Sequence, residues 1–271
     1  MFEWSFAHRV WKQTASQVQF TTDRFHHPKG VYEYELGMLE CQHILAPKMR
    51  NLFGVILAVL DKFGQKATPL VKLLAPRLTR EIDQSSVPVI IKDETRYISG
   101  FFIHKDYVED VEEVVTSEIC DTLRNLYLNR WRDSLPELYE AVHIRKGDFN
   151  IHLDTYGILS DVYYRLVIKG NLPLVIITEN AEESSDLINF LKPVLVFDSS
   201  NSSAWDALAI MSHAKVLHTS NSTLSWWAGF ASKGFGNKVT IPIPFYKSLN
   251  ANESKAKFLM NGFESRDSTF I

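Results

Sequence analysis

The second half of the chain alternates short, mainly apolar runs with amphipathic segments. The runs lie at 141–144, 174–177, 194–197, 215–218 and 238–241. Helical patterns lie between them, at 160–169, 181–191, 203–213 and 222–232. Short apolar strands that alternate with helices predict a parallel sheet covered by helices on both faces. Ligands bind such a sheet at the carboxyl ends of its strands, so the residues that follow each run are the candidates for chemistry.

The first half of the chain shows fewer strands. Residues 2–15 place aromatic and aliphatic side chains at helical spacing, and residues 17–22 alternate as a strand does. In the segment 51–78 the apolar part is short and its flanks are basic. Two interpretations of this segment stay open: a helix that faces the membrane surface or a partner, and a packed helix pair broken at Pro69.

A division into two domains is expected near Pro136. Residues 107–134 combine an acidic start with a long amphipathic helix, and the strand–helix alternation begins only after Pro136. We therefore predict an N-terminal domain over residues 1–138 and a C-terminal, nucleotide-binding domain over residues 139–271.

Composition and charge narrow the class of protein. The chain is 45% hydrophobic and 23% charged, as ordinary globular proteins are. Its 29 Lys and Arg against 32 Asp and Glu leave a net charge of -3, which argues against a nucleic-acid partner. It shows no secretory leader pattern and no apolar run of the ~18 residues that a membrane span needs. We expect a cytoplasmic protein, with the segment 51–78 as a candidate contact with the inner membrane.

A cationic turn follows the strand expected at 141–144. Arg145 offers a planar fork that matches phosphate oxygens, and Lys146 adds a second positive charge. Gly147 allows the backbone to approach a ligand closely. Asp148 could orient the arginine or bind a sugar hydroxyl. A plain ion pair on a surface turn would explain the same residues.

Small hydroxyl residues separate the strand expected at 215–218 from an apolar helix. Ser222 or Thr223 can cap that helix, although such capping needs no ligand. The amides and dipole at the helix start would then attract an anion. Because both clusters follow strands of one parallel sheet, together they predict a diphosphate site. No Asp-x-Asp motif stands at a strand end, so no metal ion is expected.

Two segments resemble motifs of the alpha-1,2-fucosyltransferase family, glycosyltransferase family 11. His143 through Phe149 matches a His-x-Arg-x-Gly-Asp-Tyr/Phe motif of that family. Ser220 through Trp227 matches a Ser-Asn-Ser-Thr-Phe-Ser-Trp-Trp motif, with Leu224 in place of phenylalanine. Weaker similarity covers most of the remaining chain in order, except residues 45–95.

The resemblance implies an α/β, GT-B-like fold with two Rossmann-like domains. Residues 1–138 would be the acceptor-side domain, without its first strand and Gly-rich loop, and residues 139–271 would be the donor-nucleotide-binding domain. It implies transfer of L-fucose from GDP-fucose to O2 of a galactose-type acceptor, with inversion and without a metal or other cofactor. Such a protein would take part in polysaccharide synthesis, with a nucleotide sugar and a glycan acceptor as partners. The resemblance places Arg145 on the donor diphosphate, with His143 and Asp148 beside it as further catalytic candidates. The candidate donor-binding residues are Lys146, Gly147, Glu179, Asn180, Ser220, Asn221, Ser222 and Thr223.

Three features depart from the family's pattern. The family places a strand and a Gly-rich loop before the first helix found here, so we expect either a start codon assigned too late or a truncated protein, which could be inactive. The segment 177–180 replaces the family's Phe-Ser-Asp-Asp and leaves one carboxylate, at Glu179, for nucleotide recognition. Lys146 stands where a second arginine is common, which keeps the charge but loses the bidentate fork. Two alternatives therefore stay open: a transferase of the same fold with another nucleotide sugar, and a degenerate, non-catalytic nucleotide-sugar-binding protein.

Overall fold

In the computed structural model, the residues described are 1–15, 18–21, 39, 44–48, 79–82, 95–99, 103–147, 149 and 152–271. They fall into two units by their internal contacts, Met1–Val115 and Thr116–Ile271. The predicted segment 51–78 and the candidate Asp148 lie outside the described residues. The predicted domains 1–138 and 139–271, and the roles assigned to them, stay a prediction.

The first unit begins with the predicted helix, α1 (Phe2–Thr14). Its apolar face is buried, and Phe6 meets Tyr107 of α4 (Asp106–Glu109) edge to face at 5.1 Å between ring centroids. The predicted strand at 17–22 is found as β1. The described strands of this unit form two parallel pairs: β1 (Val18–Thr21) with β2 (Ile44–Lys48), and β3 (Thr79–Ile82) with β4 (Thr95–Ser99).

The second unit is built on a six-stranded, all-parallel sheet. Its strands are β5 (Glu140–Ile144), β6 (Leu174–Thr178), β7 (Leu195–Asp198), β8 (Val216–His218), β9 (Lys238–Ile243) and β10 (Phe263–Asp267). The first five confirm the strands expected from the apolar runs. We had not predicted β10, because it is an edge strand with the polar sequence FESRD and its pattern shows no apolar run.

The order of the strands is β10-β9-β8-β5-β6-β7. Counted from β5 as the first strand of the unit, this is the doubly wound order of a dinucleotide-binding fold. The chain moves outward in one direction from β5 to β7, and in the other direction from β8 to β10. The switch between the two directions therefore lies between β5 and β8, where Val142 pairs with His218. Clefts for ligands form at the carboxyl ends of the strands at such a switch.

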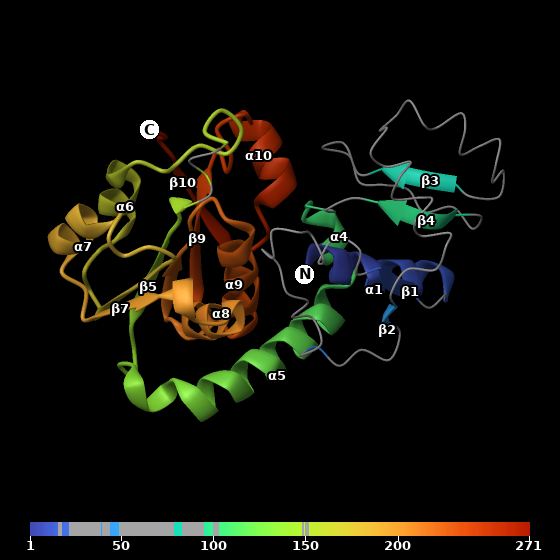
Figure 1. Ribbon diagram of the computed structural model, residues 1–271, viewed down its shortest axis with the longest axis horizontal. Coiled ribbons are helices and arrows are strands. Elements are labelled where there is room, and N and C mark those ends of the chain that lie inside the picture. The colour runs from blue at the N-terminus through green and yellow to red at the C-terminus, as the bar shows by residue number, and fades with distance from the viewer. Residues whose placement is uncertain are drawn as a thin grey trace. The chain divides into compact units, whose positions relative to one another are not determined.

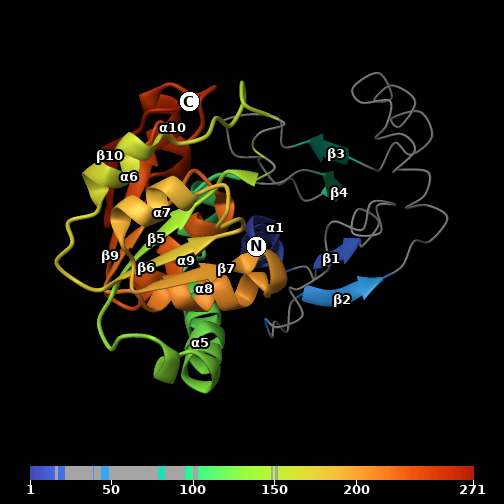
Figure 2. The same ribbon diagram turned by 60° about the vertical axis from the view of Figure 1, so that its left-hand side comes forward.

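Helices cover both faces of this sheet, as Figure 1 and Figure 2 show. On one face α6 (Asp161–Val167) and α7 (Ser185–Leu191) bury an apolar core against alternate residues of β5 and β6. On the other face lie α8 (Ala204–His213) and α9 (Thr223–Gly234), and α10 (Ala251–Phe258) contacts α9 and β9. The helix α5 (Glu112–Arg130) packs on α9 through Cys120, whose Sγ lies 3.6 Å from the Ala231 carbonyl oxygen. The unit also contains two short 3-10 turns, η3 (Arg132–Ser134) and η5 (Ser199–Asn201).

The fully buried strands β5 and β6 explain why the unit needs helices on both sides. Every residue of both strands is buried, so neither face of the sheet centre meets solvent. Among the helices of the described residues, none is both long enough and apolar enough to span a lipid bilayer.

Candidate functional site

A buried hydrogen bond joins β5 to the segment that follows β8. The Nδ1 atom of His143 lies 2.8 Å from the Ser220 Oγ atom, and both side chains are buried. The Ser220 hydroxyl also lies 3.3 Å from that of Ser225 in α9. The two motifs singled out in the sequence therefore meet at the switch point of the sheet.

His143 is neutral in this environment. Burial, with the positive charge of Arg145 as a second cause, lowers the pKa of His143 from 6.5 to about 3. Only 1% of the surface of His143 is exposed, and its ring contacts the hydroxyl of Ser220. At neutral pH it therefore supplies a hydrogen-bonding group, and no charge, to the switch point.

The turn after β5 is organised around the carboxylate of Glu179, which follows β6. Glu179 Oε1 accepts a hydrogen bond from the Lys146 backbone amide at 3.0 Å. The same oxygen lies 3.4 Å from Arg145 Nε. A Cβ atom placed on Gly147 would lie only 2.6 Å from this oxygen. Any larger residue at position 147 would therefore require the Glu179 side chain to move from its place against the turn.

The cationic side chains of this turn lie at the surface of the second unit. The Arg145 side chain is 25% exposed, and its Cζ lies 5.4 Å from the centroid of the Phe149 ring. Phe149 in turn stacks on Tyr156, with 5.0 Å between the ring centroids. Lys146 donates from Nζ to the Glu183 carbonyl oxygen at 3.1 Å. Arg145 therefore lies between a carboxylate and an aromatic ring, which restrict its position.

The start of α9 is capped and anchored by side chains. Ser222 is the N-cap, and its Oγ accepts a hydrogen bond from the Leu224 amide at 3.3 Å. Thr223, half-buried, is the first helical residue. The buried Asn221 donates both amide hydrogens to the 156–157 loop, to the Tyr156 oxygen at 3.0 Å and to the Gly157 oxygen at 2.9 Å. The predicted cap is confirmed, and the loop and helix start are held together.

Asn180 closes the turn that leads from β6 to α7. Its Oδ1 atom accepts a hydrogen bond from the Glu183 amide at 3.1 Å, and its own amide donates to Thr178 Oγ1 at 3.3 Å. The structure thus shows a local role for Asn180 within the loop, and its assignment as a donor-binding residue stays a prediction.

Sequence reasoning missed the contact between Glu179 and the β5 turn. Ile144 pairs with Thr178 in the parallel ladder, so Arg145 and Glu179 each follow directly on a paired residue. The contact could be predicted only once β6 was known to be the neighbour of β5 and their register was known.

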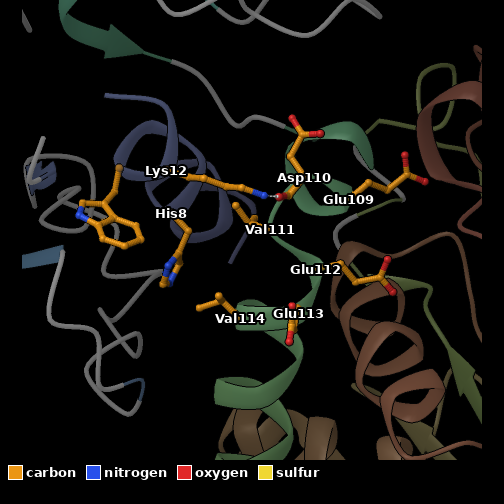
Figure 3. Close-up of a pocket in the computed structure, with 9 residues that line it drawn as sticks. His8, Lys12, Glu109, Asp110, Val111, Glu112, Glu113 and Val114 are labelled. Atoms are coloured by element: carbon orange, nitrogen blue, oxygen red, sulfur yellow. Dashed lines mark hydrogen bonds between the residues drawn. The ribbon is translucent and has the colours of Figure 1, made fainter. Parts of the chain in front are cut away.

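The first unit contains a pocket of about 510 Å³, shown in Figure 3. Its polar lining comes from α1 and from the corner between α4 and α5: His8, Lys12, Glu109, Asp110, Glu112 and Glu113. Lys12 donates to the Asp110 carbonyl oxygen, and Arg9 Nε lies 3.1 Å from the Asp110 carboxylate. Acidic residues at the start of α5 also complement the helix dipole. The acidic lining therefore has a structural explanation within this unit.

Comparison with known proteins identifies one family. The model of glycosyl transferase family 11 matches residues 80–262, which is more than half of the chain. Comparison with curated proteins gives no match.

Solved structures show only a distant likeness. POFUT1 in its apo form is 11% identical, with a TM-score of 0.36 over 87% of this chain and 78% of that chain. The beta Kdo 2,7 transferase KpsC of Thermosulfurimonas dismutans is 12% identical, with a TM-score of 0.30 over 91% of each chain. POFUT1 in complex with GDP is 10% identical, with a TM-score of 0.30 over 87% of this chain and 83% of that chain. Scores this low do not establish a shared fold.

Proposed function

The chain belongs to glycosyl transferase family 11 and is therefore a glycosyltransferase, and we propose that it transfers L-fucose from GDP-fucose to O2 of a galactose-type acceptor. We propose further that the reaction inverts the anomeric carbon and proceeds without a metal ion. The GT-B-like pairing of two Rossmann-like domains is part of the same proposal. The doubly wound strand order of the second unit supports it for the donor-binding half.

The donor diphosphate is proposed to bind between the β5 turn and the start of α9. The observation that carries this proposal is the buried hydrogen bond of 2.8 Å between His143 and Ser220, which joins the two motifs. On one side Arg145, with Lys146 and Gly147, offers positive charge and close backbone approach. On the other side the amides and dipole at the start of α9, with the hydroxyls of Ser220, Ser222 and Thr223, attract an anion.

In the proposed reaction, the acceptor hydroxyl oxygen forms a bond to C1 of fucose from the face opposite the diphosphate. The bond from C1 to the β-phosphate oxygen breaks, and its electron pair leaves with GDP. The acceptor proton passes to a general base or to water. Arg145 and the amides of α9 stabilise the negative charge that develops on the leaving phosphate, because they are already oriented before the reaction. The buried His143 contributes by holding Ser220 in place.

The test measures fucose transfer from GDP-fucose to a β-galactoside with the purified chain. Replacing Arg145 by Ala should lower kcat/KM by about 10²–10³, the usual loss when one oriented charge-stabilising group is removed. Arg132→Ala, at a site where the side chain is 60% exposed in the η3 turn, is the matched control and should leave the rate unchanged. An Arg145→Ala enzyme with near-normal turnover would overturn the assignment of the diphosphate site.

Donor screening decides between the proposed reaction and its two alternatives. Transfer from a UDP-sugar in preference to GDP-fucose would identify a transferase of the same family with another donor. Nucleotide binding without transfer would identify a non-catalytic protein. The expected location in the cytoplasm, with the segment 51–78 at the inner membrane, stays a prediction, since that segment lies outside the described residues.

A further inference from the structure

We infer that Glu179 is a positioning residue: its carboxylate holds Arg145 and the β5 turn in the geometry that receives the donor diphosphate, and it does not contact the nucleotide base. This inference rests on the proposed function, because it gives Arg145 its role toward the diphosphate. It also differs from the expectation drawn from the sequence, in which Glu179 takes part in nucleotide recognition.

Two contacts of the Glu179 carboxylate reach the β5 turn. One oxygen, Oε1, accepts from the Lys146 amide at 3.0 Å and lies 3.4 Å from Arg145 Nε. Its side chain is 19% exposed and that of Arg145 is 25% exposed, so both lie partly out of water, where charge pairing is less screened. A single carboxylate oxygen therefore ties the backbone and the guanidinium of the same turn together.

The point of contact on Arg145 explains why the pair should help a diphosphate bind. Nε is the guanidinium nitrogen nearest the backbone, so a carboxylate at this atom restrains the torsions of a long, otherwise mobile side chain. The Phe149 ring, 5.4 Å from Cζ, restricts the same group from another direction. An arginine that is already ordered loses less entropy when it binds phosphate oxygens.

Gly147 provides independent support for this arrangement. A Cβ atom at this position would meet Oε1 of Glu179 at 2.6 Å and Cγ at 3.2 Å. The Glu179 side chain could move aside, but its oxygen would then leave the Lys146 amide and Arg145. The substitution Gly147→Ala should therefore reproduce the effect of removing the carboxylate.

The first experiment measures the binding of GDP and UDP to the whole chain by calorimetry. The variant Glu179→Gln keeps an acceptor for the Lys146 amide and loses the charge beside Arg145. We expect Kd to rise on the order of tenfold for both nucleotides, with the ratio of the two affinities unchanged. Glu182→Gln, on the exposed part of the same loop, is the matched control and should bind as the wild type does. A changed GDP-to-UDP ratio in Glu179→Gln would show contact with the base and overturn the inference.

A double-mutant cycle tests whether Glu179 acts through Arg145. In an Arg145→Ala background, Glu179→Gln should change the Kd for GDP by less than about twofold, because the group that it orients is already gone. Independent, multiplicative losses would overturn the inference, since Glu179 would then contribute by itself.

A second cycle separates this inference from the proposed function, because it needs no nucleotide. Gly147→Ala should lower the midpoint of urea unfolding in the wild-type background, and it should do so much less in a Glu179→Ala background, where no carboxylate is displaced. An equal effect in both backgrounds would show that the carboxylate is not held against the turn. A wild-type chain that binds neither GDP nor UDP would overturn the proposed function, and the second cycle would still decide the contact.

Discussion

The buried His143 predicts a specific loss of stability in mild acid. Burial, with the charge of Arg145 as a second cause, lowers its pKa from 6.5 to about 3, so the folded chain keeps the ring neutral while the unfolded chain protonates it. Where the unfolded state binds more protons, stability falls as pH falls. The contribution of His143 is therefore complete above about pH 6.5 and is lost progressively as pH falls toward 3.

The size of the effect follows from the shift. Each unit of pH in this window changes the free energy of unfolding by about 1.4 kcal/mol. Between pH 7 and pH 5 the unfolded chain passes its own histidine pKa and gains most of one proton, while the folded chain stays nearly unprotonated at this site. The expected loss from His143 alone over this interval is about 2 kcal/mol.

The perturbation is His143→Gln, in which an amide can still bond to Ser220 but cannot titrate. Urea unfolding followed by tryptophan fluorescence at pH 7, 6 and 5 gives the free energy of unfolding for each protein. The variant should be less stable at pH 7 by about 1–2 kcal/mol, because the ring is fully packed. Its further loss between pH 7 and pH 5 should be smaller than that of the wild type by about 2 kcal/mol.

The control is His152→Gln, which replaces an exposed histidine and so measures the effect of losing a histidine that is not buried. Equal losses between pH 7 and pH 5 in the wild type and in His143→Gln would refute the reasoning. The neutral, buried ring would then not be the source of the acid sensitivity.

Two further predictions concern buried polar contacts beside the site. Burial opposes ionisation of Glu140, but the hydrogen bond of 2.6 Å with His218 and two backbone amides lower the pKa of Glu140 below 4.5. Its contribution is therefore present above pH 4.5 and lost as pH falls through the lower, folded value. Glu140→Gln should cost about 1–3 kcal/mol at pH 7, and its urea midpoint should approach that of the wild type as pH falls through the lowered, folded pKa of Glu140. Asn221→Ala removes two buried hydrogen bonds to the 156–157 loop, so it should cost about 2 kcal/mol in urea unfolding and weaken GDP binding; unchanged values would contradict the anchoring role.

Local patterns predicted most of the second unit. The apolar run at 141–144 is β5 (Glu140–Ile144), and the pattern at 222–232 is α9 (Thr223–Gly234). These elements were predictable because burial of a whole strand leaves an apolar run, and burial of one face of a helix leaves a helical period. The edge strand β10 buries only one of its five residues, so its sequence carries neither pattern.

The site was predictable as a set of residues but not as an arrangement. The two motifs at His143–Phe149 and Ser220–Trp227 could be found in the sequence, and the cap at Ser222 followed from local rules. The strand order was not predicted, and that order makes β5 the neighbour of β8 and joins the two motifs.

The sequence by itself therefore determined the types and positions of the elements in the second unit and the chemical groups available at their ends. Only the tertiary structure decided that Glu179 meets the β5 turn and that His143 is buried neutral. The physical reason is distance along the chain. Helix and strand periods depend on residues a few positions apart, whereas these contacts join residues 33 and 77 positions apart. Such contacts form only when the sheet fixes which strands are neighbours and in which register they pair.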